Sequence, residues 1–209
     1  MKNIEIVTYG DKAFPNALRQ IPNPPQRIYV EGDVSLLQTL SISIIGSRKC
    51  LTESGMQAKK LAYDLACRRI TIVSGMALGI DTLAHLGALE TNEKTIAVLG
   101  CGFNHIFPKE NIWLYRKILE NGGAVISEYP PDTYPCSKRF LERNRIISGI
   151  SKGTIVVEAT YRSGSSATAR LAKKQGRVVF GTENSINNIP EGAILINAAK
   201  DVIDYLKIG

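Results

Sequence analysis

The chain has 209 residues, of which 44% are hydrophobic and 22% are charged, and its formal net charge is +7. This hydrophobic content can form the core of one large domain and excludes a wholly disordered chain. No apolar run approaches the roughly 20 residues of a membrane-spanning helix, and the first residues lack the long apolar region of a signal peptide. We therefore expect a cytoplasmic protein without a membrane partner. The positive charge favours an acidic partner such as nucleic acid, although a lysine-rich solvated surface explains it equally well.

The cysteines and histidines are too widely separated to form a metal-binding motif or a disulfide framework. They are Cys50, Cys67, Cys101, Cys136, His85 and His105. We expect buried free thiols, and we expect neither a metal nor a cofactor.

Residues 1–40 differ from the rest of the chain because prolines, including Pro15, Pro22, Pro24 and Pro25, interrupt any long helix. We expect turns and short helices leading to a strand at 27–30. This part is interpreted as a leader that packs on the main domain, which takes residues 41–209.

Short runs rich in isoleucine and valine then alternate with stretches of helical periodicity. This pattern is typical of an α/β fold with a doubly wound, mostly parallel sheet and helices on both faces. The predicted strands are 42–46, 70–74, 95–99, 124–127, 154–158 and 178–181. The predicted helices begin near caps at Thr52 and Asp81 and continue at 111–120, 139–149, 165–174 and 200–206.

Ligands of such a sheet bind outside the carboxyl ends of its strands, so the loops after the strands are the candidate site. The strand, turn and helix at 70–85 are typical of an anion-binding turn. The first N–H groups of a helix lack partners, and Gly75 and Gly79 let the backbone approach a ligand closely. The candidate residues are Ser74, Gly75, Met76, Ala77 and Gly79.

The loop after the first predicted strand of the main domain contains Gly46, Ser47 and Arg48. Its guanidinium lies beside backbone that can contact phosphate, although a structural salt bridge is an equally good explanation. Neither the G-x-G-x-x-G spacing nor the P-loop spacing occurs, which disfavours an ordinary NAD or ATP site.

The segment 138–145 surrounds one aromatic residue, Phe140, with four cations and an amide. An exposed Phe140 would stack a base while the cations follow a nucleic-acid backbone. A core position for Phe140 with solvated charges is the alternative, and the spacing does not choose between them. The candidates are Lys138, Arg139, Phe140, Arg143 and Asn144.

The hydroxyl-rich run at 163–168 follows a strand and opens a helix. Its hydroxyls can cap that helix or bind phosphate, and the flanking Arg162 and Arg170 favour an anion. The candidates are Ser163, Gly164, Ser165, Ser166 and Thr168. Glu128 and Glu158, at strand ends, could serve a hydrolase, but we favour a structural role in fixing arginines or loop amides and name no catalytic residue.

Together these residues resemble the DprA/Smf family of DNA-processing proteins. The similarity spans most of residues 9–205 and is carried by 44–48, 74–81 with Ala84 and His85, 95–102, 127–130, Phe140 with 143–147, 157–159, and 163–165 with Thr168 and Ala169. It implies an extended Rossmann-like domain that binds single-stranded DNA without catalysis, usually as a homodimer, and assists RecA loading in natural transformation and recombination. The resemblance assigns the candidate residues of the loops at 46–48, 74–79 and 163–168 and of the segment 138–144 to the DNA-binding face.

Two departures from the family accompany this resemblance. The chain has no room for the N-terminal helical or C-terminal winged-helix domain of many members, and Gly181 to Ser185 stand where the family often shows Val-Pro-Gly. The rival interpretation is a Rossmann-like nucleotide sensor or a nucleoside-monophosphate phosphoribohydrolase, in which Glu158 would lie near the chemistry. The Pro-Gly-Gly-x-Gly-Thr loop of those enzymes is not matched by 163–168.

Overall fold

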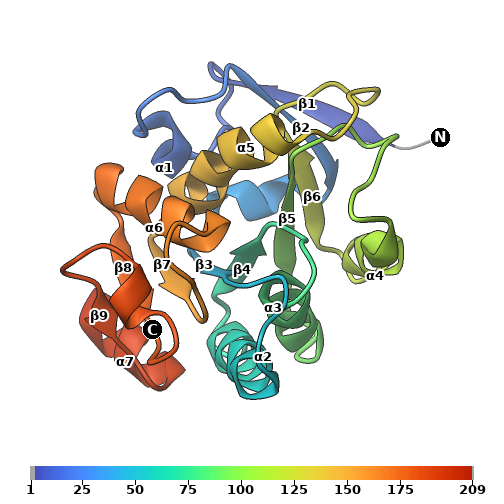
Figure 1. Cartoon of the computed structure of the whole chain (residues 1–209). Helices are drawn as coiled ribbons and strands as arrows, with labels where there is room; N and C mark the ends of the chain where they lie inside the picture. Colours follow the sequence, from blue (N-terminus) through green and yellow to red (C-terminus); the bar gives the residue numbers. More distant parts are fainter. Residues whose placement is uncertain (1–2, 209) are drawn as a thin grey trace.

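A nine-stranded sheet runs through the computed structural model, which describes residues 3–208 (Figure 1). The strands are β1 (Ile4–Thr8), β2 (Arg27–Gly32), β3 (Ser41–Ile45), β4 (Thr71–Ser74), β5 (Thr95–Leu99), β6 (Ala124–Ser127), β7 (Gly153–Val156), β8 (Val178–Gly181) and β9 (Ile194–Leu195). Their order across the sheet is β1-β2-β6-β5-β4-β3-β7-β8-β9. Strands β3 to β9 are mutually parallel, whereas β1 and β2 are antiparallel to their neighbours.

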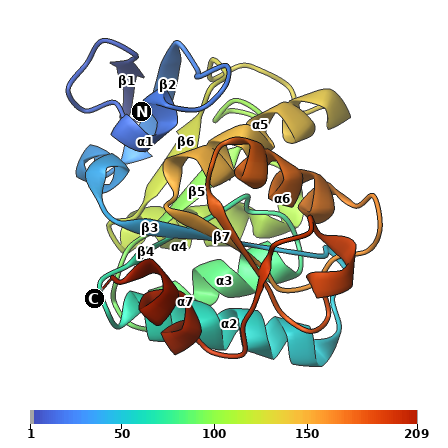
Figure 2. The ribbon, with the colours of Figure 1, turned by 90° about the vertical axis from the view of Figure 1, so that its left-hand side faces the viewer.

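Helices cover both faces of the sheet, as the view in Figure 2 shows most clearly. The α-helices are α1 (Asn16–Arg19), α2 (Thr52–Ala66), α3 (Ile80–Leu89), α4 (Ile112–Glu120), α5 (Ser137–Ile150), α6 (Gly164–Lys174) and α7 (Ala199–Leu206), and the short 3-10 helices are η1 (Val34–Gln38), η2 (Lys109–Asn111) and η3 (Ile186–Asn188). Helices α1, α5 and α6 pack on one face, and α2, α3, α4 and α7 pack on the other. The predicted doubly wound, Rossmann-like α/β fold is therefore confirmed.

The chain reverses its direction of winding beside β3. It first adds β4, β5 and β6 on one side of β3, then crosses over and adds β7, β8 and β9 on the other side. Strands β3 and β7 are consequently hydrogen-bonded neighbours, with Ile45 paired to Val156, although more than one hundred residues separate them. This is the topological switch point of the sheet, where open α/β folds bind their ligands.

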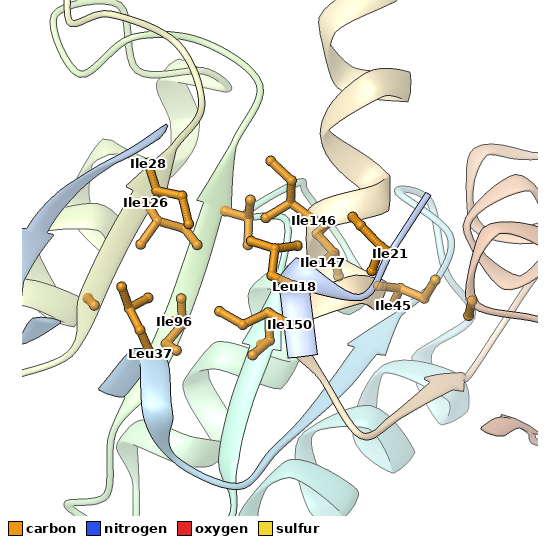
Figure 3. Packing of buried hydrophobic residues seen from close by; sticks show 14 of the residues in the cluster. Leu18, Ile21, Ile28, Leu37, Ile45, Ile96, Ile126, Ile146, Ile147 and Ile150 are labelled. Carbon is orange, nitrogen blue, oxygen red and sulfur yellow. The ribbon is translucent and has the colours of Figure 1, made fainter. Parts of the chain in front are cut away.

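The central strands are buried on both faces because alternate side chains enter different cores. On β3, Ile42 and Ile44 pack under α2 and α3, whereas Ile45 packs under α5. Figure 3 shows the core on the α5 face, where Ile147 and Ile150 lie near Leu18 of α1.

The first 40 residues pack on the core and contain the predicted short helix, α1, and the predicted strand, β2, but strand β1 was not predicted. Strand β1 pairs with β2, and β2 pairs with β6, so this part extends the sheet itself. Strand β1 is difficult to predict because it is an edge strand in which only Val7 is buried. Its sequence therefore lacks a clear alternation of apolar and polar residues. The proposed division at residue 40 stays a prediction.

The cysteines only partly match the expectation of buried thiols. Cys101 is buried and Cys50 is partly buried, but Cys67 and Cys136 are exposed. The prediction is wrong for these two because each lies at the solvent-exposed end of a helix, α2 and α5 respectively. No helix within residues 3–208 is long and apolar enough to cross a membrane.

Candidate nucleic-acid interface

A groove of about 730 Å³ lies at the switch point, where the loop after β3 and the loop after β7 lead to helices on opposite faces. We call it the switch-point groove. Its walls come from these two loops, from one side of α5, from the start of α6 and from residues that follow β4 and β5. It is lined by Ile45, Gly46, Ser47, Arg48, Lys49, Ala77, Asp81, Phe107, Ser137, Phe140, Leu141, Arg143, Asn144, Ile147, Thr160, Ser163, Gly164, Ser165 and Thr168.

Most of the residues predicted from sequence are brought together here. The groove is lined by Gly46, Ser47, Arg48, Ala77, Phe140, Arg143, Asn144, Ser163, Gly164, Ser165 and Thr168 from that set. Outside its lining lie Ser74, Gly75, Met76, Gly79, Lys138, Arg139 and Ser166. The residues that line the groove but were not among the sequence candidates are Ile45, Lys49, Asp81, Phe107, Ser137, Leu141, Ile147 and Thr160. Thr160 could have been predicted, because it lies four residues past the end of β7, in a loop at the carboxyl edge of the sheet.

The loop at 74–79 does not offer the vacant anion cradle that its sequence predicts. The Asp81 carboxylate accepts hydrogen bonds from the N–H groups of Gly75 and Ala77, at 3.1 and 3.3 Å. Asp81 is the second residue of α3 rather than its cap, and Gly79 takes the cap position. The expectation of unpartnered donors is wrong here because the chain supplies its own carboxylate. A DNA contact by this loop stays a prediction.

The same loop supports the neighbouring loop at 46–49. Gly79 has a φ of 76°, and a Cβ placed on it would overlap the carbonyl oxygens of Ser47 and Arg48. The N–H of Ile80 donates to the carbonyl oxygen of Ser47 at 3.1 Å. A glycine is therefore needed at this position to bring α3 close enough to hold the Arg48 loop.

Arg143 lies at the floor of the groove and is almost wholly buried. Only 5% of the residue is exposed, and its guanidinium donates to the carbonyl oxygens of Gly75, at 2.8 Å, and Val98. Burial lowers the pKa of Arg143 to about 10, against the opposing effect of Asp81. Burial also raises the pKa of Asp81, against the opposing charge of Arg143. The two groups compensate each other inside the protein.

Helix α5 presents a stripe to the groove with Phe140, Arg143, Asn144 and Ile147 at i, i+3, i+4 and i+7. Phe140 is half-buried, so neither of the two sequence alternatives describes it fully. A Cβ on Gly100 would lie 2.6 Å from Cδ1 of Phe140, which shows how closely the ring covers this glycine. The ring therefore forms part of the wall while keeping some exposure to the groove.

Exposed positive charges lie in the groove lining, at Arg48 and Lys49, and next to the lining in the chain, at Lys138. Arg48 and Lys49 are exposed, and neither forms an ion pair with any residue between 3 and 208. The Lys138 side chain is 85% exposed, with its Nζ 3.8 Å from Glu142 Oε1, a contact of little strength in water. These cations are available to an anionic ligand.

At the start of α6, the hydroxyl groups of Ser163 and Ser166 form hydrogen bonds within the protein. Ser163 caps the helix by accepting from the N–H of Ser166 at 3.2 Å, which confirms the capping interpretation for Ser163. Ser166 is buried, and its hydroxyl donates to the carbonyl oxygen of Asn188 at 2.6 Å. Gly164, Ser165 and Thr168 remain along the groove.

The two strand-end carboxylates have structural partners, as expected. Glu128 accepts two hydrogen bonds from the Arg145 guanidinium, at 2.6 and 2.8 Å. Glu158 accepts from the N–H of Leu51 at 2.9 Å, directly before α2. Among the described residues no group of three or more His, Cys, Asp and Glu side chains could hold a metal ion.

Comparison with known proteins gives a consistent result. The sequence model of the DNA recombination-mediator protein A family matches residues 5–207. Protein Smf of Escherichia coli is 39% identical over 99% of this chain, and DNA processing protein DprA of Streptococcus pneumoniae is 38% identical over 92%. The chain spans 58% of the length of the first relative and 71% of the second.

Solved structures agree with the sequence relatives. The X-ray structure of DNA processing protein A from Streptococcus pneumoniae has a TM-score of 0.88 at 35% identity, covering 97% of this chain and 74% of that one. A structure describing the single-stranded DNA binding mode of DNA processing protein A from Helicobacter pylori has a TM-score of 0.85 at 33% identity, covering 99% and 98%. The chain therefore belongs to the DNA recombination-mediator protein A family, which includes the DprA and Smf proteins.

Proposed function

We propose that this protein binds single-stranded DNA in the switch-point groove and acts without catalysis. The observation that carries the proposal is the combination of a half-buried aromatic wall, Phe140, with the exposed cations Arg48 and Lys49 in one groove. Stacking on an aromatic ring and neutralisation of phosphates are the two interactions by which proteins hold single strands. The single-stranded DNA binding described for the Helicobacter pylori relative supports the same choice.

Different residues take different parts in this proposal. Arg48, Lys49 and Lys138 neutralise phosphates, and Phe140 stacks a base, which is accessible only when the strand is unpaired. Groove hydroxyls and the Asn144 amide donate to the backbone or to base edges.

In this proposal Arg143 positions helix α5 and does not contact DNA. Its guanidinium is hydrogen-bonded to main-chain carbonyls, so it holds α5 against the loop at 74–79 instead of reaching the strand. Sequence specificity should be low, because stacking and phosphate contacts carry little base information.

We propose that the protein is not catalytic because both candidate acids, Glu128 and Glu158, already have hydrogen-bond partners within the protein. Glu128 is paired with Arg145, and Glu158 is hydrogen-bonded to the N–H of Leu51. Incubating the protein with nucleoside monophosphates should therefore give no free base by chromatography. Rapid base release that disappears in Glu158→Gln would favour the phosphoribohydrolase instead.

We further propose, from family membership, that the protein works as a homodimer and assists the loading of RecA on single strands in transformation and recombination. Analytical ultracentrifugation tests the first statement. A RecA-dependent strand-pairing assay, with and without this protein, tests the second, and no stimulation in that assay would contradict it.

The binding proposal is tested by fluorescence anisotropy with labelled oligothymidine and with a duplex of the same length at low salt. We expect clear preference for the single strand. Phe140→Ala should weaken binding by about fivefold or more, whereas Phe140→Tyr should bind nearly as wild type because it keeps the stacking face. No binding, or equal affinity for the duplex, would contradict the proposal.

A further inference from the structure

A ridge formed by two joined loops stands beside the switch-point groove. The loops follow β5 and β6, so they lie at the same carboxyl edge of the sheet. The N–H of Gly102 donates to the carbonyl oxygen of Thr133 at 2.8 Å, and the N–H of Asn104 donates to that of Pro131 at 2.9 Å. The Asn104 amide also donates a hydrogen bond to the Asp132 carboxylate at 2.7 Å, so this acidic group has a partner within the ridge.

The ridge carries an exposed pair of stacked aromatic rings. The rings of His105 and Tyr134 have centroids 3.8 Å apart and planes inclined by 26°. Tyr134 is nevertheless 68% exposed, so the face of its ring turned away from His105 meets solvent. The stack fixes the orientation of the phenol ring before any ligand arrives, which lowers the entropic cost of binding to its open face.

This aromatic pair is continuous with the groove. Phe107 lies two residues beyond His105 and Ser137 three residues beyond Tyr134, and both line the groove. Arg139 donates a hydrogen bond from its guanidinium to the carbonyl oxygen of Tyr134 at 2.7 Å. The same guanidinium lies over the ring of Tyr129, 5.6 Å from its centroid, and the exposed Lys138 precedes Arg139 in the chain, so two cations belong to the segment that follows Tyr134.

We propose that Tyr134, supported by His105, is a second stacking site for a nucleobase of the same single strand that occupies the groove. The inference rests on the proposed function. A flat exposed aromatic face in a segment that also carries cations fits an unpaired base with its phosphate, and the loops that carry the pair continue into Phe107 and Ser137 of the groove lining.

The test is a series of oligothymidines of increasing length, titrated against wild type, Tyr134→Ala and Tyr134→Phe. Tyr134→Ala should weaken the long oligonucleotides by about fivefold or more and leave the shortest binding oligonucleotides unchanged. Tyr134→Phe should behave as wild type. Tyr63→Ala, which truncates an exposed tyrosine on α2, is the matched control and should have no effect at any length.

A second measurement uses only the wild-type protein, so it does not require that a variant folds. Photocrosslinking of the wild type with long oligonucleotides containing 5-iodouracil should attach DNA to the peptide that includes Tyr134. Crosslinks confined to groove peptides, or equal weakening by Tyr134→Ala at every length, would overturn the second site. Failure of the wild type to bind oligothymidine of any length would instead refute the proposed function itself.

Discussion

The guanidinium of Arg143 donates a hydrogen bond to the carbonyl oxygen of Gly75, 2.8 Å away, and thereby ties α5 to the loop after β4. Asp81 completes this connection by accepting from the N–H groups on the same loop. A charged network thus supports the floor of the groove, while other cations stay free for a ligand.

Arg143→Ala should destabilise the protein by about 2–5 kcal/mol, because it leaves the buried carbonyl oxygens of Gly75 and Val98 without their donor and removes the positive charge that opposes the effect of burial on Asp81. Lys138→Ala, on the same helix but exposed, should change stability by less than about 0.5 kcal/mol. Urea unfolding followed by circular dichroism measures both. Equal stability of Arg143→Ala and wild type would show that the network contributes little.

Gly79→Ala should impair both stability and DNA binding. Alanine is strained at the positive φ of this residue, and its Cβ would displace the Ser47 and Arg48 carbonyls, which position the Arg48 loop. Gly10→Ala is the matched control, because a Cβ there meets no atom within 4 Å. Unfolding curves and oligothymidine titrations should separate the two variants, and indistinguishable curves would contradict the close approach of the two loops.

Acidification should destabilise the protein through His85. Burial lowers the pKa of this imidazole from 6.5 to about 3, and its Nδ1 lies 2.8 Å from Thr95 Oγ1. The unfolded chain takes up a proton below pH 6.5, while the folded protein resists it until about pH 3. The stabilisation is therefore complete above pH 6.5 and falls by about 1.4 kcal/mol per unit as the pH decreases between these values.

Unfolding free energies measured at several pH values should isolate this effect when wild type is compared with His85→Gln. The comparison is needed because the raised pKa of Asp81 acts in the opposite direction and favours the folded state in acid. Wild type should lose more stability than His85→Gln between about pH 6.5 and pH 5. Parallel profiles would show that His85 does not titrate differently in the two states.

The sequence predicts the central strands well because a parallel sheet buried on both faces requires continuous apolar runs, such as residues 96–99. It does not reveal that β3 and β7 pair, since no local pattern records the strand order. The pairing of β3 with β7, which brings the loops that contain Arg48 and Ser163 to one groove, becomes visible only in the fold.

The inward orientation of Arg143 agrees with its place on the apolar face of α5. Arg143, Ile146, Ile147 and Ile150 lie at i, i+3, i+4 and i+7, which is one face of a helix, and all four are buried. An arginine on an apolar stripe is expected to turn inward and donate to buried acceptors. Its acceptors, the carbonyl oxygens of Gly75 and Val98, could not be identified in advance because no local pattern links them to Arg143.

The most direct test of the central claim is the salt dependence of oligothymidine binding by Arg48→Ala. Lys60→Ala is the control, because this exposed lysine lies on α2 away from the groove lining. Removal of one phosphate contact should reduce the magnitude of the log-log salt slope by about 0.7 and weaken binding at low salt, while the control matches wild type. An unchanged slope and affinity in Arg48→Ala would contradict single-strand binding in the switch-point groove.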